Sequence, residues 1–277
     1  MAIGGSLRRV AVTIALAFGV LSANPAHATL MFDGVATGTK AGIGTSNVVL
    51  TVQNTPTEQG CVGWNGTVDI IGSTACPGGL SPTITGGDEK TGSSQTQTRT
   101  VAQAGVLSGA SLVLIVNVSE PAGTLFTAEN LSLSIYSPTG VVLFNSGNLF
   151  GAGVPPAGGV TLNSSLQGQA NLGFAFVLDA TEAAAIDPFL CTSALVLGCG
   201  GLSAQTLATN ANNRIGLAAL LTNVQGGNET FSVADLANVS LAPPPNVTPE
   251  PSPLVTFAVG LVFLGLSRKI LRRRSTP

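Results

Sequence analysis

The sequence predicts an all-β fold, a β-sandwich or jelly-roll with one short helix, for residues 29–242. Short runs of β-branched and apolar residues alternate there with Gly, Asn, Ser and Pro, which is the pattern of strands separated by turns. In LSLSIYSPTGVVLF, apolar and polar residues alternate before the turn, as expected of a strand with one face in water. About nine such runs occupy roughly 215 residues, enough for two sheets that enclose a core.

The first 28 residues have the features of a secretory signal peptide. Arg8 and Arg9 give a basic start, an apolar stretch follows from Val10 to Leu21, and Ala26-His27-Ala28 offers a cleavage site of small residues. We therefore expect export, followed by cleavage after Ala28.

Nine runs are expected to form the strands of the exported domain. They are Val48–Gln53, Thr67–Ile71, Ser111–Val118, Leu131–Ser137, Val141–Asn145, Leu172–Leu178, Arg214–Leu221, Glu229–Val233 and Asn238–Ala242. Turn sequences such as Ser137–Gly140 separate neighbouring runs, whereas Pro56–Gly60 and Gly86–Ser94 are expected to be loops.

The predicted helix lies in DATEAAAIDPF. Asp179 or Thr181 can cap its first turn, the alanines favour its continuation, and Pro188 is expected to end it.

Four cysteines fall into two local pairs, Cys61 with Cys76 and Cys191 with Cys199. Three connectivities are possible, and we expect local pairing because each pair encloses Gly-rich sequence that can fold back. The alternative is a zinc site made of all four thiolates. No CxxC is present, and the only histidine, His27, would leave with the signal peptide, so disulfides formed in an oxidising compartment are favoured.

The charge of the exported part excludes some classes of function. Between residues 29 and 250 there are four basic and thirteen acidic residues, a net charge of −9. Nucleic-acid binding is disfavoured, because phosphate contacts need a basic surface. A chain without histidine after residue 28 also cannot build a Ser–His–Asp or Cys–His catalytic device.

Carboxylates remain the only candidates for acid–base chemistry. Those considered are Asp33, Asp69, Asp88, Glu89, Glu120, Asp179 and Asp187. No pairing of them is visible, and the chain has one Trp and one Tyr, few for a sandwich glycosidase. We therefore interpret them as solvated loop acids and expect no enzyme activity and no cofactor. Asp88-Glu89 offers hard oxygens for Ca²⁺, but the spacing matches no EF-hand loop.

Two other features could contact a ligand. Trp64, in GWNGT, could stack on a sugar ring, which makes a carbohydrate-binding module the alternative function, although a single Trp is more often a packing residue. In SSQTQTRTV, Ser94, Thr96, Thr98 and Thr100 would share one face of an extended segment, as in ice-binding surfaces, but one short row is more often an ordinary strand face.

The C-terminus carries an apolar run followed by basic residues. A Pro-rich linker, residues 243–248, precedes Leu254–Leu266, which as a helix would span about 20 Å of a roughly 30 Å hydrocarbon core. Arg268 and Lys269 can snorkel, so that a transmembrane helix could extend over about 253–271. We expect these two residues, with Arg272, Arg273 and Arg274, to stop transfer through the membrane.

The order Pro249-Glu250-Pro251, apolar helix, arginine cluster in residues 249–277 resembles the PEP-CTERM sorting signal, also called the ice-binding protein C-terminal domain. The resemblance covers about a tenth of the chain. It implies a substrate of an exosortase, a membrane-embedded transpeptidase of Gram-negative bacteria that would cut near the Pro-Glu-Pro motif. Family members are often associated with exopolysaccharide and biofilm. The resemblance thus implies a protein sorted to the cell surface or extracellular matrix, with the exosortase and the membrane as partners. It says little about the exported domain, for which the missing histidine favours a non-enzymatic role.

Overall fold

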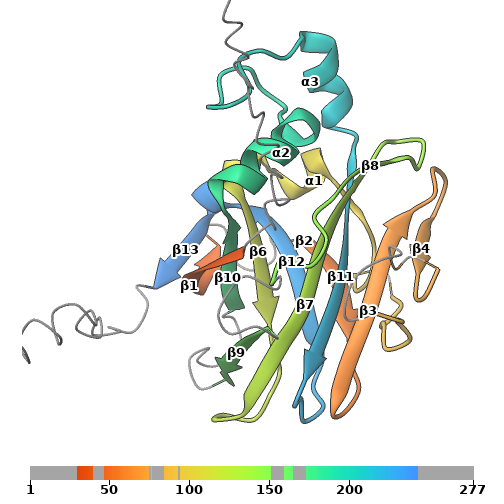
Figure 1. The fold of residues 1–277 in the computed structure, drawn as a ribbon, viewed down its shortest axis with the longest axis vertical. Helices are drawn as coiled ribbons and strands as arrows, with labels where there is room; N and C mark the ends of the chain where they lie inside the picture. The colour runs from red at the N-terminus through yellow and green to blue at the C-terminus, as the bar shows by residue number, and fades with distance from the viewer. Residues whose placement is uncertain are drawn as a thin grey trace, which may run out of the picture.

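Two antiparallel β-sheets packed face to face form the body of the protein in a computed structural model (Figure 1). The structure describes residues 30–39, 47–74, 76, 84–92, 94–150, 159–164 and 173–242. Over these residues the all-β prediction is confirmed, as a sandwich-like arrangement of two sheets.

The first sheet has six strands. Their order is β13 (Val239–Ala242), β1 (Leu30–Thr39), β10 (Gly173–Leu178), β6 (Leu112–Asn117), β12 (Glu229–Asp235) and β2 (Asn47–Val52).

The second sheet has seven strands. The main path is β4 (Asp69–Ile71), β3 (Thr57–Trp64), β11 (Arg214–Thr222), β7 (Leu125–Tyr136) and β8 (Val142–Asn145), while β5 (Arg99–Thr100) pairs with β11 and β9 (Val160–Asn163) pairs with β7.

The core lies between the sheets and is built by alternation along the strands. On β6, Leu112 and Leu114 belong to the same buried cluster as Leu131 and Leu133 on β7. Side chains of this size contribute about 1.5–3 kcal/mol each when fully buried, so these central strands supply much of the stability.

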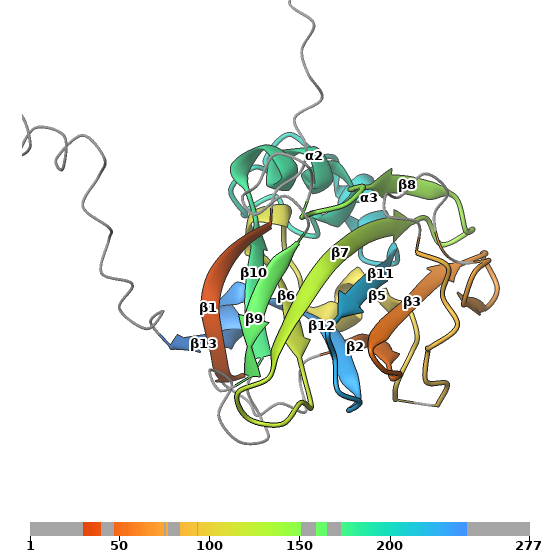
Figure 2. The same cartoon turned by 60° about the horizontal axis from the view of Figure 1, so that its bottom comes forward.

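Short helices cover one end of the sheets, and strand connections form the other end. α2 (Ala180–Leu190) and α3 (Ala204–Asn210) lie at the top in Figures 1 and 2, and α1 (Val101–Ala104) lies just below them in Figure 1. The β2–β3, β6–β7 and β11–β12 connections lie at the bottom in Figure 1. The prediction of a single helix is therefore wrong, because the described residues contain three.

α2 begins as predicted but ends later. Asp179 is its N-cap and accepts bonds from the backbone N–H of Thr181 and Glu182. Pro188 lies inside the last turn rather than after it. The terminal carbonyls that need partners there are satisfied from α3, since Asn210 Nδ2 donates to the oxygens of Pro188 (2.9 Å) and Cys191 (3.0 Å).

Each of the nine predicted runs overlaps a strand, but four strands were not expected. These are β1, β3, β5 and β9. The prediction of a loop over Pro56–Gly60 is wrong, because β3 starts at Thr57. Within Gly86–Ser94, the described residues form only an isolated bridge, between Glu89 and Val52.

The two terminal predictions lie outside the described residues. These are the signal peptide, residues 1–28, and the linker and sorting tail, residues 243–277, with Pro249, Glu250, Pro251 and the basic residues from Arg268 to Arg274. Within the part of the chain that the structure describes, no helix has the length and apolarity needed to cross a membrane.

Candidate functional site

Three glutamates gather where the strand connections meet, at the end of the sandwich away from the helices. Glu58 is on β3 and is paired with Leu221 in the second sheet. Glu229 opens β12 and is paired with Val52 in the first sheet. Both are 0% exposed. Glu120 belongs to the β6–β7 connection and is partly buried.

Each of these carboxylates is oriented by a backbone N–H on one of its two oxygens. Asn54 N donates to Glu58 Oε1 (2.9 Å), Gln225 N to Glu120 Oε1 (2.8 Å) and Ser119 N to Glu229 Oε1 (3.3 Å). The second oxygen, Oε2, is buried in all three residues and has no donor. The connections thus hold one oxygen of each carboxylate in place through a backbone N–H.

Glu58 and Glu229 face each other across the two sheets. A hydrogen bond between their carboxyl groups requires that one of them carries a proton. Burial, followed by the hydrogen bond and charge of Glu58, raises the pKa of Glu229. Burial also raises the pKa of Glu58. Glu120 raises both pKa values further through its charge, so the pair is held as an acid and its carboxylate.

No side-chain cation balances this cluster within the described part of the chain. The one ion pair there joins Arg214 to Asp69, with 3.9 Å between NH1 and Oδ1. Asp88 adds a further negative charge near Glu58. Its own oxygens are occupied, since Asn54 Nδ2 donates to Oδ1 (2.7 Å) and Gln59 N to Oδ2 (2.9 Å).

Most of the other candidate acids accept hydrogen bonds from backbone N–H groups. Glu89 accepts from the N–H of Cys61 (2.7 Å) and Gly87 (2.8 Å). Asp187 accepts from Gly109 N at 2.6 Å, and Asp179 caps α2. Asp33 is exposed on β1. The paired carboxylates, Glu58 and Glu229, are not among the seven acids that the sequence analysis considered.

The sequence pattern of β12 predicts the inward position of Glu229, one member of the Glu58–Glu229 pair that the sequence analysis missed. On β12, Phe231 and Val233 belong to the core between the sheets, and Glu229 shares their side of the strand. The same alternation from Val62 places Glu58 inward on β3, but that segment was interpreted in part as a loop.

Trp64 lies in a different cluster, between β3, β11 and the β7–β8 turn. The guanidinium carbon of Arg214 stands 3.7 Å from the ring centroid, and Nε1 donates to the carbonyl oxygen of Pro138 (2.9 Å). Arg214 NH1 also donates to Thr98 Oγ1 (2.9 Å). One face of the indole is therefore covered by a cation, a contact that stabilises the fold by about 0.5–2 kcal/mol.

The threonine row does not form an exposed face. Thr96 and Thr98 are buried, at 4% and 2% exposure. Thr96 Oγ1 donates to Thr51 O (3.2 Å), and Thr98 N donates to Asp69 (3.0 Å). The two central members thus hold neighbouring segments, which argues against an ice-binding surface.

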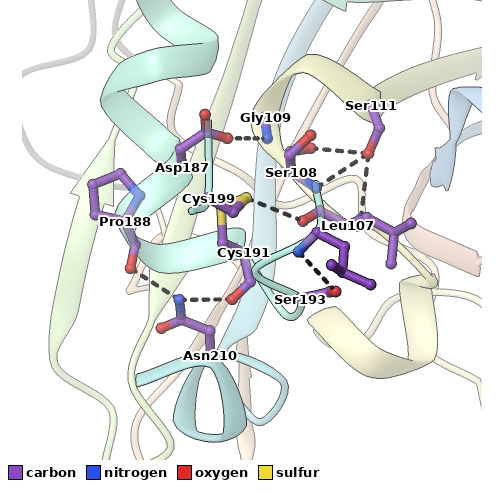
Figure 3. The surroundings of a disulfide bond; sticks show 11 residues. Leu107, Ser108, Gly109, Ser111, Asp187, Pro188, Cys191, Ser193, Cys199 and Asn210 are labelled. Atoms are coloured by element: carbon purple, nitrogen blue, oxygen red, sulfur yellow. Dashed lines mark hydrogen bonds between the residues drawn. A yellow bond between two sulfur atoms is a disulfide. The ribbon is translucent and has the colours of Figure 1, made fainter. Parts of the chain in front are cut away.

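Both predicted disulfides are confirmed, and this contradicts the alternative of a four-thiolate zinc site. Cys61 on β3 is bonded to Cys76 with 5.1 Å between Cα atoms, and Cys191 to Cys199 with 5.7 Å. The second bond closes the loop after α2, close to Asp187 and Asn210, as Figure 3 shows. Leucines 195 and 197 in this loop are almost fully exposed, at 97% and 92%.

Comparisons with known proteins gave no significant match, whether to a protein-family model, a curated protein or a solved structure.

Proposed function

We propose that the chain is an exported, non-enzymatic β-sandwich protein of the cell surface or extracellular matrix. Its tail, residues 249–277, serves as a sorting signal of the PEP-CTERM type and is processed by an exosortase in a Gram-negative bacterium. The mature protein is expected to associate with exopolysaccharide or biofilm.

The observation that carries this proposal is the use of all four cysteines in two disulfides. Structural disulfides persist in oxidising compartments and are rare in the cytosol. Their presence agrees with the basic-apolar-small order of residues 1–28, which by itself predicts export.

The geometry of the acidic cluster favours a non-enzymatic role. In most glycosidases, two carboxyl groups stand about 5–9.5 Å apart on either side of a sugar that reaches them from solvent. Glu58 and Glu229 are instead in hydrogen-bond contact and wholly buried. A saccharide has no room between them.

A carbohydrate-binding module is the alternative, with Trp64 as its contact residue. The ring is partly exposed, but one face is already covered by Arg214. Binding to exopolysaccharide that is lost in Trp64→Ala, while the protein stays folded, would favour this alternative.

Mass spectrometry of the mature C-terminus tests the sorting proposal. In a host with an exosortase, the surface protein is expected to end near Pro249–Pro251. Replacing Pro249, Glu250 and Pro251 together with Ala is the matched control and should leave an uncut, membrane-bound precursor. A wild-type C-terminal peptide that runs through Pro277 would make the tail a plain membrane anchor.

A further inference from the structure

We propose that the loop closed by the Cys191–Cys199 disulfide inserts two leucines into a lipid membrane. Leu195 and Leu197 in this loop are 97% and 92% exposed. The other exposed large apolar side chains among the described residues are at most 58% exposed. The inference rests on the proposed function in one respect, because the sorting tail is what brings the domain to a membrane.

The loop is held in place while it displays these side chains. The disulfide joins its two ends, and Asn210 Nδ2 donates to the carbonyl oxygen of Cys191 (3.0 Å). Val196, between the two leucines, packs against the buried cluster that contains both cysteines, and its carbonyl oxygen accepts from Cys199 N (3.0 Å). The exposure of the leucines therefore belongs to an ordered loop, which loses little conformational entropy when it meets a partner.

Leu107 adds apolar surface beside the loop. It follows α1 in the sequence, and its side chain is 43% exposed. Its carbonyl oxygen lies 3.8 Å from Cys199 Sγ, and Figure 3 shows the residue close to the disulfide and to Ser193. Leucines that are far apart in the sequence thus contribute to the same end of the sandwich, the end covered by helices.

This end of the molecule carries no charge over a long stretch of sequence. From Pro188 to Asn213, which includes the end of α2, the loop and α3, there is no acidic or basic residue and no histidine. Charges are costly to place in a membrane, so a segment that enters lipid should lack them. A domain with a net charge of −9 is repelled by anionic lipid headgroups, and an uncharged end is the part that can approach the bilayer.

The size of the apolar surface favours a membrane over a protein partner. A stable protein interface buries about 800 Å² on each partner and requires complementary shapes. Three leucines expose on the order of a few hundred Å², within the range found on ordinary monomers. Leu195 and Leu197 project from the surface and form no groove, since each is more than nine-tenths exposed. Fluid lipid chains adapt to such a projection, whereas a protein partner would need a matching pocket.

The leucines alone would give a weak membrane contact. Complete burial of one leucine shifts an equilibrium about tenfold to a hundredfold. Two leucines therefore resemble a single acyl chain, whose membrane binding is marginal and reversible.

The proposed tail would make this weak contact effective. Once the tail holds the domain at the bilayer, the second contact is intramolecular and needs little affinity of its own. Eleven residues separate Ala242 from Leu254 and span up to about 40 Å when extended, a length comparable with the size of the domain, so either end can turn to the bilayer. We expect the loop to contact the membrane in the uncut precursor and to leave it after processing.

Fluorescence of the full chain in phosphatidylcholine vesicles tests the inference. Leu197→Trp places a reporter in the loop. Leu125→Trp is the matched control, because Leu125 is 58% exposed at the start of β7, at the opposite end of the sandwich. Trp64 is present in both variants, so its emission is measured in the wild type and subtracted. We expect lipids with brominated acyl chains to quench Leu197→Trp several-fold more strongly than Leu125→Trp. Adding Leu195→Ser to the Leu197→Trp chain should weaken the membrane contact about tenfold or more.

The outcomes distinguish this inference from the sorting proposal. Equal quenching of Leu197→Trp and Leu125→Trp in vesicle-bound protein would overturn the loop contact and leave the tail as the anchor. A blue-shifted Leu197→Trp emission that bromolipids do not quench, in a protein with the mass of a dimer by light scattering, would assign the leucines to a second copy. Protein that does not bind the vesicles at all would contradict both the loop contact and the anchor. Strong quenching, together with a mature C-terminus at Pro277, would keep the loop contact and reject the sorting.

Discussion

At the scale of single residues, Glu182 is a buried acid at the end of the sandwich opposite the three glutamates. Glu182 occupies the first turn of α2 and is 7% exposed. Its backbone N–H donates to Asp179 Oδ1 (2.8 Å), while its own Oε1 has no donor. Burial, and then the charge of Asp179, raises the pKa of Glu182 to about 7. The folded protein therefore favours the neutral acid at this position.

This shift predicts a pH-dependent stability. Between about pH 4.5 and 7 the folded state keeps a proton on Glu182 that the unfolded chain has lost, so the free energy of unfolding should fall as pH rises. The slope from this residue is at most about 1.4 kcal/mol per pH unit. Urea unfolding at pH 5 and pH 7 measures it, and Glu182→Gln should reduce the difference. Asp33→Asn changes an exposed acid and should leave this pH-dependent difference in the free energy of unfolding unchanged. An equal reduction of the difference in both variants would contradict its assignment to Glu182.

At the scale of elements, short β-branched and apolar runs bounded by turn residues were the pattern that predicted strands best. Runs such as Ser111–Val118 were found because apolar residues dominate them. β3 was missed because its sequence, TEQGCVGW, places a glutamate and two glycines in a strand that is buried for most of its length. A buried carboxylate cannot be recognised from local hydrophobicity, since the partner that satisfies it lies on another strand. For the same reason the sequence predicted both disulfides, which are local, and missed the Glu58–Glu229 pair, which is not.

The disulfides should contribute to stability through the elements that they fix. Chain-entropy arguments give about 3 kcal/mol for the Cys61–Cys76 loop and about 2.5 kcal/mol for the Cys191–Cys199 loop. Changing either pair to serines should lower the free energy of unfolding by amounts of this order, as measured by denaturant titration. Peptide mapping of the exported wild type should recover both local cross-links; free thiols, or a cross-link between the two regions, would contradict the pairing.

At the scale of the whole molecule, the proposed function gives the two sheets and the terminal segments different tasks. Within the described residues the two sheets share one core, from Leu114 in the first to Leu133 in the second. We expect changes in residues 249–277, the proposed sorting tail, to leave this domain folded. Neither the sequence nor the fold names a ligand for the domain, because its polar surface is dominated by Gly, Ser, Thr and Asn rather than by a recognisable charged or aromatic constellation.

Replacing Arg272, Arg273 and Arg274 with serine tests this separation. Each charge costs about 2.5–3.5 kcal/mol to place at the centre of a membrane helix, so their loss should weaken stop-transfer and increase leakage into the medium. Fractionation of cells and medium measures the effect, and the melting temperature of the released domain should equal that of the wild type. Replacing Ser275 and Thr276 with Ala is the control, because it changes the same tail without changing its charge. Full retention of the arginine variant would assign the anchoring to another segment.

The wide sequence separation of Glu58 and Glu229 also has a kinetic consequence. In the proposed export from the N-terminus, β3 emerges early and β12 among the last strands. We expect the two carboxyl groups to meet only when the second sheet has closed on the first, so that a proton shared between them forms its contacts after the rate-limiting barrier of folding. Interactions that form after that barrier slow unfolding and leave the folding rate almost unchanged. The glutamates would then set how long the domain survives outside the cell rather than how quickly it forms.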